Sequence, residues 1–582
     1  MMLQAAQTRL TTVSPPPIFH QVLQPVGNSL FLSFVVGFIP IAVVLVLLGI
    51  VRRPAWQAAA AGLIVGLIIA ITLWQMPVNM AVSATLAGFA FALFPIMWIV
   101  WNAMWLYNIA VRTGKFDLFR RWMTHNVPPD KRILLLIVGF SFGALMEGIA
   151  GFGTPVAIGS ALLIGLGFPV LDALVLTLIF DTAPVAFGAL GVPITTLATV
   201  TGLPAHSLSA MVGRQLPLFA LVLPFYAIVL VTGWRGLRTA WPAALVAGGS
   251  FAITQFAVSN FVGPELPDVL AALVSLLCTI GFVQIWRPRD VESYRAHFAD
   301  VSGQAIAANA IGEVNIPTGG GGNGGIGGAN GEQSDAKPSA KEAILAWLPW
   351  VLVSVIVIIW TYLKVALRGQ QSIKWPGLSG QVELAGATKP IAVVYAFQPL
   401  GTGTAILLTV LITAVLLGAS PRIVGLALAD TWTQLRFAIL TVMLIIGLAY
   451  VFNYSGIAYT EGNALATVGK IFPFFSAFLG WLACFLSGSD TSSNALFGKL
   501  QVVAATKLHL SPTLMAATNS SGAVMSKMIS PQNVTTGVST TSLNGKEGLV
   551  IRRTFVHSIV LAALLGLLAM AQQYLIPGII PH

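Results

Sequence analysis

The segment EGIAGFGTPVAIGSALLIGLGFPVLDALVLTLIFDTAPVAFGALGVPI, residues 147–194, decides the fold of this chain. It is apolar enough to lie in a bilayer, but glycines, prolines and carboxyl groups interrupt it at Glu147–Pro155 and again at Asp181–Pro184. Backbone groups that leave a helix inside a membrane are costly unless protein, water or a ligand satisfies them. The segment therefore predicts unwound backbone around a polar cavity within the membrane.

The composition extends this interpretation to the whole chain. Of 582 residues, 56% are hydrophobic and only 8% are charged, against about a quarter charged in a soluble domain. The net charge of +11 lies mainly in short loops between apolar runs, so it indicates membrane topology and not a nucleic-acid partner. Cys278 and Cys484 both fall in apolar runs, which predicts neither a disulfide framework nor a thiolate metal site.

Arginine and lysine clusters mark the cytoplasmic ends of spans and predict a path through the bilayer. Arg52 and Arg53 follow the first span, which places both the N-terminus and, after the last span, the C-terminus outside. The Gly-rich stretch 319–331 cannot bury enough surface to fold. The predicted parts are an extracytoplasmic segment 1–29, a first repeat 30–240, two linking helices 241–286, a flexible cytoplasmic linker 287–342 and a second repeat 343–582.

Both repeats contain a split hairpin followed by a broken span. In the first repeat these lie at about 133–168 and 170–199, and in the second at about 471–505 and 513–534. The first repeat starts outside and the second inside, so their topologies are opposite. The predicted fold class is an all-α polytopic membrane protein with about 12 transmembrane helices and two re-entrant hairpins in an inverted-topology repeat.

The interruptions of the two repeats correspond at an offset of about 340 residues. Glu147–Pro155 aligns with Ser487–Asn494, and Asp181–Pro184 aligns with Asn519–Gly522. Paired interruptions in inverted halves are typical of the substrate site of a secondary transporter. We therefore expect breaks at all four places and a site near the middle of the bilayer.

Four ionisable residues fall inside apolar segments, where isolated charges are expensive and usually functional. Glu147, Asp181 and Asp490 are expected to couple an ion, or else to form structural hydrogen bonds. A carboxyl group removed from water gains affinity for protons, which suits a coupling role. Lys527 is expected to pair either with a substrate carboxylate or with one of these acids.

Hydroxyl and amide groups at the interruptions are the predicted substrate ligands. Helix ends that restart after a break direct N–H groups at a cavity, which suits a carboxylate. Small and hydroxyl residues also serve close helix packing, but two clusters in corresponding positions favour a site. The predicted ligands are Gly153, Thr154, Thr182, Ser492, Ser493, Asn494, Asn519, Ser520 and Ser521.

Other patterns exclude several classes of site. No phosphate-binding loop of the form GxxxxGK[ST] is present, which argues against an ATP-driven pump, and no histidine pattern has metal-ligand spacing. Arg436 and Glu461 lie near span ends, where a side chain that reaches the interface is the simpler interpretation.

Three motifs closely resemble the bacterial L-lactate permease family: residues 147–194 above, SGSDTSSNALFGKLQ at 487–501 and NSSGAVMSKMISPQNV at 519–534. The likeness extends over most of the chain in length and span layout, apart from the Gly-rich insert. It implies uptake of L-lactate, and commonly D-lactate and glycolate, driven by a proton gradient across the bacterial inner membrane. It also implies a relation to ion transporters with paired hairpins and elevator-type motion. The expected partners are substrate, a coupling proton and the bilayer, with no cofactor and no nucleic acid; a homodimer is left open.

Three alternatives stay open at this point. A sodium-coupled dicarboxylate carrier would use carbonyl groups at helix breaks to bind Na⁺, although two carboxylates need more cationic donors than Lys527. A channel could use a Gly-rich hairpin as its filter, but broken spans in inverted halves favour a carrier. A membrane-embedded enzyme would need a base beside the serine and aspartate residues, and no histidine is convincingly placed for that role.

Overall fold

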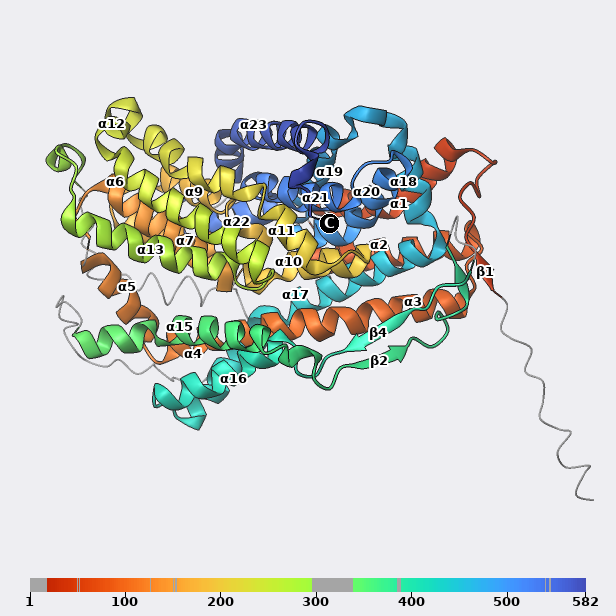
Figure 1. Ribbon diagram of the computed structural model, residues 1–582, viewed down its shortest axis with the longest axis horizontal. Helices are drawn as coiled ribbons and strands as arrows, with labels where there is room; N and C mark the ends of the chain where they lie inside the picture. The colour runs from red at the N-terminus through yellow and green to blue at the C-terminus, as the bar shows by residue number, and fades with distance from the viewer. Residues whose placement is uncertain are drawn as a thin grey trace, which may run out of the picture.

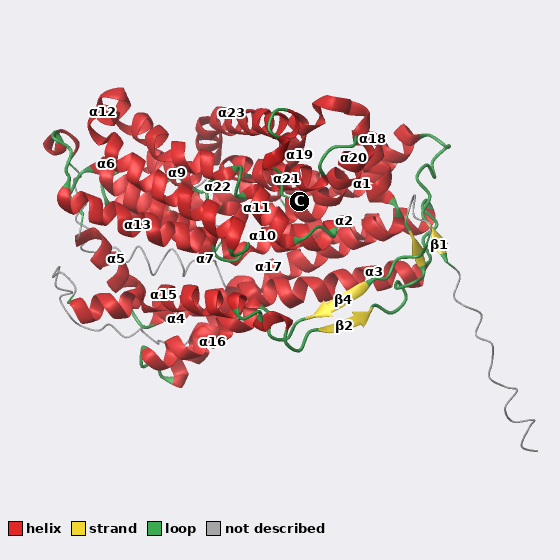
Figure 2. Ribbon diagram, viewed as in Figure 1, coloured by secondary structure: helices red, strands yellow, loops and turns green. Residues whose placement is uncertain are grey.

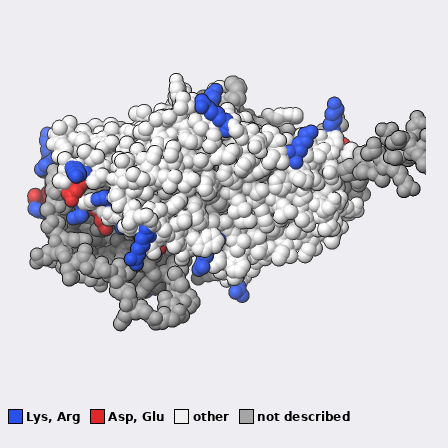
Figure 3. Space-filling model, turned by 90° about the horizontal axis from the view of Figure 1, so that it is seen from below, with Lys and Arg blue, Asp and Glu red and all other residues white. Residues whose placement is uncertain are grey.

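The computed structural model is that of an all-α polytopic membrane protein, as predicted. It describes residues 18–49, 51, 53–125, 127–149, 151, 154–295, 339–384, 389–539, 541–543 and 546–581. Within these ranges 10 helices are long and apolar enough to cross a bilayer, or up to 11 if the bent pair Val170–Phe180 and Val185–Thr201 forms one span. Figure 2 shows helices throughout and strands only at one edge. Figure 3 shows a broad face with few charged side chains, as contact with lipid requires.

The first half of the chain runs from plain spans through a hairpin and a broken span to two long helices. The longest, α12, turns at Gly233, where φ is +67°. The elements of the first half are α1 (Leu30–Gly49), α2 (Ala55–Thr72), α3 (Val78–Phe91), η1 (Ala92–Met97), α4 (Trp98–Arg112), α5 (Lys115–His125), α6 (Lys131–Leu134), η2 (Leu135–Phe142), α7 (Gly143–Ile149), α8 (Thr154–Gly165), α9 (Val170–Phe180), η3 (Val185–Phe187), α10 (Gly188–Thr201), α11 (Ala205–Val212), α12 (Leu216–Phe261), α13 (Pro267–Ile285) and η4 (Val291–Tyr294).

The second half contains another hairpin, α19–α20, and another broken span, α21–η7–α22. Its elements are α15 (Ala340–Tyr362), η5 (Val365–Leu367), β2 (Gln371–Lys374), β3 (Val382–Glu383), β4 (Val394–Phe397), α16 (Thr402–Leu416), α17 (Pro421–Ser455), α18 (Ile457–Leu465), η6 (Ala466–Ile471), α19 (Phe472–Ser487), α20 (Asp490–Lys507), α21 (Pro512–Ser526), η7 (Lys527–Ile529), α22 (Pro531–Ser539), α23 (Glu547–Tyr574) and η8 (Pro577–Ile579). Strand β1 (Phe19–His20) pairs in parallel with β3, and β2 pairs antiparallel with β4. The Gly-rich stretch 319–331 and the N-terminal residues 1–17 lie outside the described residues, and the predicted linker 287–342 is described only at 287–295 and 339–342.

The arm of the first hairpin is enclosed by protein. Residues 132–149 are all buried, whereas the windows of the other candidate spans are only 33–56% buried. Its base is held by Arg132, whose buried guanidinium lies 2.6 Å from Asp130 Oδ2 and 2.9 Å from Asp290 Oδ1. Polar interruptions in this hairpin therefore face protein and not lipid, which is where unwound backbone can be satisfied.

The broken span of the first half changes direction between α9 and α10. The two parts are bent by 63°, and Ala189, Leu190 and Gly191 all have positive φ, at +45°, +57° and +76°. A β-carbon on Gly191 would lie 2.2 Å from Pro264 O, so the close approach of backbone at this turn requires glycine.

The break that we expected at Asn519–Gly522 is wrong. Helix α21 continues through these residues to Ser526, and the chain leaves the helix at Lys527–Ser530. The reason is close helix packing, because a β-carbon on Gly522 would lie 2.1 Å from Ala477 O on α19. Small residues here let two helix backbones approach, which is their other common role in membranes.

The two halves meet at the centre of the molecule. Helix α10 of the first half packs against α20 of the second, and α11 packs against α21. Figure 1 shows these helices near the middle of the view, with α12 and α13 to the left, α23 above and α18 to the right. The hairpin and the broken span of each half thus lie next to those of the other half.

Candidate functional site

A buried ion cluster joins the two halves. Lys527 Nζ donates a hydrogen bond to Glu147 Oε1 at 2.8 Å and lies 3.0 Å from Asp181 Oδ2. The three side chains are 5%, 4% and 3% exposed, respectively. Lys527 belongs to the second half and both acids belong to the first. In this structure Lys527 therefore pairs with acids of the first half.

Local backbone geometry places each member of the cluster. Glu147 lies near the end of α7, Asp181 directly follows α9, and Lys527 begins η7. A β-carbon on Gly188, the first residue of α10, would lie 2.5 Å from Glu147 Oε1. The carboxylate of Glu147 therefore occupies space that only a glycine leaves free.

The cluster has more acceptor atoms than the described protein groups satisfy. Among the described residues, Glu147 Oε2 and Asp181 Oδ1 accept no hydrogen bond. Asp181 Oδ2 is within ion-pair distance of Lys527 but does not have hydrogen-bond geometry. Two acids face one ammonium group, and a buried charge is costly unless it is paired. The arrangement can therefore take up a proton or receive a donor from a ligand. Within the same described ranges, no group of His, Cys, Asp or Glu is placed to hold a metal ion.

A second polar cluster surrounds Asp490 at the start of α20. Ser520 Oγ donates to Asp490 Oδ2 at 2.6 Å, and Asn494 Nδ2 donates to Ser520 Oγ at 3.1 Å. Asn494 Nδ2 also donates to Pro193 O on α10 at 3.1 Å, so this cluster too joins the halves.

Several predicted ligands are already engaged by protein groups. Asn519 Nδ2 donates to Asn494 Oδ1 at 3.0 Å, and Asn519 Oδ1 accepts from Gln501 Nε2 at 2.6 Å. Ser493 Oγ donates to Gly480 O at 3.1 Å. Thr182 Oγ1 donates to the carbonyl of Ile179 in its own helix turn at 2.6 Å. These groups hold α19, α20, α21 and the first break in place.

Other predicted ligands keep polar atoms available. Among the described residues, Ser521 Oγ and Asp490 Oδ1 have no hydrogen-bond partner although both are buried. Ser492 lies in the first turn of α20, where its backbone N–H donates to Ser489 Oγ at 3.3 Å. Thr154 begins α8, its side chain is not described, and Gly153 lies outside the described residues.

Sequence analysis did not single out Gln255 and Asp268, which support the first break. Gln255 Nε2 donates to Ala183 O at 3.0 Å and to Asp268 Oδ1 at 2.9 Å. Asp268 is 1% exposed and lies against the hairpin tip, since a β-carbon on Gly148 would be 3.3 Å from Asp268 Cβ. In the sequence Asp268 resembles an ordinary acid in the first turn of a helix at the membrane surface. Only tertiary contacts reveal its burial.

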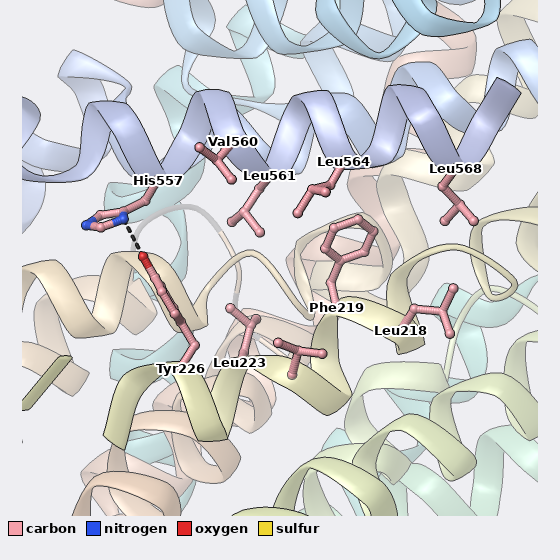
Figure 4. A pocket seen from close by; sticks show the side chains of 10 residues that line it. Leu218, Phe219, Leu223, Tyr226, His557, Val560, Leu561, Leu564 and Leu568 are labelled. Atoms are coloured by element: carbon pink, nitrogen blue, oxygen red, sulfur yellow. Dashed lines mark hydrogen bonds between the residues drawn. The ribbon is translucent and has the colours of Figure 1, made fainter. Parts of the chain in front are cut away.

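A separate cavity lies in a groove between α12 and α23. It has a volume of about 390 Å³, and Figure 4 shows it lined by apolar side chains except where Tyr226 hydrogen-bonds His557. A 2-hydroxy carboxylate needs several converging donors, which this groove does not offer. The ion cluster, and not the groove, is therefore the candidate site. The lining residues are Leu218, Phe219, Val222, Leu223, Tyr226, His557, Val560, Leu561, Leu564 and Leu568.

Comparison with known proteins agrees with the resemblance of the motifs. The sequence pattern of the L-lactate permease family matches residues 33–576. A glycolate permease of Escherichia coli is 41% identical over 574 residues, which cover 96% of this chain and 99% of that protein. L-lactate permeases of Salmonella typhimurium and Bacillus subtilis are each 38% identical, covering 97% and 96% of this chain and 100% and 99% of theirs. This chain belongs to the L-lactate permease family.

Proposed function

We propose that this protein is a secondary transporter that imports L-lactate, and also D-lactate and glycolate, together with protons. The names of its relatives support the substrate class, because proteins similar over nearly their whole length are a glycolate permease and L-lactate permeases. These substrates share a carboxylate with a neighbouring hydroxyl group, so one binding geometry serves them all.

The observation that carries the proposal is the excess of acid in the buried cluster. Lys527 can neutralise only one of the two carboxylates, Glu147 and Asp181, so a neutral cluster already contains one proton. An entering anion that pairs with Lys527 displaces the ionised acid, which then needs a proton of its own. Because net charge is expensive inside the membrane, the anion and a proton enter together.

The remaining polar groups suit the rest of the substrate. Ser521 Oγ and Asp490 Oδ1 are the buried atoms we assign to the substrate hydroxyl group. The N–H groups in the first turns of α8, where Pro155 supplies none, and of α20 add positive dipole ends for the carboxylate. In this proposal Asn494, Asn519 and Ser520 hold these groups in position and do not bind substrate directly.

The distribution of basic residues supports a location and an orientation. Arg52 and Arg53 follow α1, while Arg235 and Arg238 follow the turn in α12. Because such clusters favour the cytoplasmic side, we propose that both chain termini lie outside the cell. We therefore propose the bacterial cytoplasmic membrane as the location.

Uptake of labelled lactate into proteoliposomes tests the proposal, with proton and sodium gradients imposed separately. We expect an inward proton gradient to drive accumulation above equilibrium, and a sodium gradient at constant pH to drive none. Accumulation that follows sodium alone would favour the dicarboxylate carrier, for which succinate should then compete better than glycolate. If lactate entered protein-free liposomes as fast as it enters proteoliposomes, the proposal would be contradicted.

A further inference from the structure

Glu461 is a fully buried carboxyl group outside the two clusters described above. It lies on α18 and is 0% exposed, and neither oxygen has a hydrogen-bond partner among the described residues. The prediction that its side chain reaches the membrane interface is therefore wrong. The reason is that α18 is enclosed by α1, α17 and α20.

Apolar atoms lie beside this carboxyl group. A β-carbon on Gly37 would lie 3.3 Å from each of three atoms, which are Glu461 Oε1, Ile457 Cγ2 and a ring carbon of Trp74. The carboxyl oxygen thus rests against the backbone of α1, in space that Gly37 leaves open. Within the described part of the chain, no ion pair includes Glu461.

Among the described residues, no charged group on the neighbouring elements forms an ion pair with Glu461. Helix α1 carries no charged group. Lys499 on α20 donates to Thr201 O at 3.3 Å and lies 5.6 Å from the centre of the Tyr459 ring. The other titratable groups on these elements are Asp490 and Lys507 on α20, Arg422, Asp430, Arg436, Tyr450 and Tyr454 on α17, Cys484 on α19 and Lys470 on η6.

An ionised carboxylate in such a place would be far more costly than a neutral one. Transfer of an unpaired charge into an apolar environment is expensive, and carboxyl groups there take up a proton instead. In the conformation described here, Glu461 therefore holds a proton.

Packing links this site to the substrate clusters. A β-carbon on Gly462 would lie 2.4 Å from Val503 Cβ and 2.8 Å from Leu500 O, so α18 and α20 are in intimate contact. Helix α20 begins at Asp490. A movement of α20 relative to α1 during transport would carry α18 with it and expose Glu461 to water, where it can ionise.

We propose that Glu461 is a second proton-binding site, which carries one further proton per transport cycle. This inference rests on the proposed proton coupling and adds to it. With the proton of the ion cluster, two protons would accompany each lactate anion, so each cycle would move net positive charge. Without Glu461, one proton and one anion would move no net charge.

The substitution Glu461→Gln tests this in proteoliposomes, because glutamine has the same shape and cannot release a proton. Each coupled proton supports about tenfold accumulation per pH unit. We expect E461Q to exchange lactate for lactate as the wild type does, but to reach accumulation about tenfold lower per pH unit. An inside-negative membrane potential should raise accumulation by the wild type and leave E461Q unaffected. Glu292→Gln, at a side chain that is 82% exposed, is the matched control and should behave as wild type.

The outcomes separate the two proposals. Wild type without proton-driven accumulation overturns the proposed function, whereas E461Q with wild-type accumulation and response to potential overturns only the role of Glu461. If E461Q does not fold, infrared spectra of the wild type and of Glu461→Asp test instead whether Glu461 binds the proton. A carbonyl band of a protonated carboxyl that changes with lactate, and shifts in the aspartate variant, supports the role. An identical band in both proteins overturns it.

Discussion

Replacement of Lys527 by methionine removes the only cation paired with Glu147 and Asp181 among the described residues. Methionine preserves most of the volume of the side chain, so the change is mainly one of charge. Loss of one partner from a buried ion pair costs about 3–5 kcal/mol of folding free energy, because the remaining charge is left uncompensated. Lys527→Met should therefore unfold at a clearly lower temperature than wild type and should not transport lactate.

A second experiment tests whether the uncompensated charge causes the lost stability of this variant. Adding Glu147→Gln and Asp181→Asn removes the uncompensated acids, so the triple variant should recover most of the lost stability and still not transport. Thermal unfolding in detergent, followed by tryptophan fluorescence, measures stability, and uptake into proteoliposomes measures transport. Lys507→Met, at an exposed position on α20, is the matched control. A single variant as stable as wild type, or a triple variant less stable than the single, would refute the reasoning.

Three further substitutions test the geometry around the clusters. Gly188→Ala places a methyl group 2.5 Å from Glu147 Oε1, so it should reduce lactate uptake at least as much as Glu147→Gln does, with normal membrane levels. Gly522→Ala forces α21 away from Ala477 O, which lies 2.1 Å from the new carbon; overpacking of this kind costs about 1–3 kcal/mol, seen as a lower unfolding temperature. Asn519→Ala leaves buried amide partners unsatisfied, at a cost of about 1–3 kcal/mol of folding free energy. It should abolish lactate uptake while the protein still reaches the membrane. Normal uptake by this variant would contradict the role assigned to Asn519.

The charged members of the site could be predicted because a charge in an apolar run is visible in the sequence. Glu147, Asp181 and Lys527 stand out for this reason, and the structure brings all three together. Nothing in their spacing shows which acid would face the lysine, because the contact joins segments 380 positions apart.

The residues between 519 and 522 show the limit of such reasoning. Serine and glycine residues in an apolar segment fit both a break and a close helix contact. The choice depends on the neighbour, here the backbone of α19, which no local pattern reveals.

Glu461 was assigned to the membrane interface, and Asp268 was not singled out, for a related reason. Each lies near the predicted end of a span, where acids are usually solvated. Their burial results from how α1, α13, α18 and α20 pack, and this information is tertiary.

The central claim is that an anion and a proton enter one buried, nearly neutral cluster together. Its most direct test is the pH of a weakly buffered solution of purified protein when lactate binds. We predict that the protein takes up about one proton for each lactate bound, so that the pH rises, and that the variant lacking both cluster acids gives no rise. Lactate binding to the wild-type protein without any change in pH would contradict the claim.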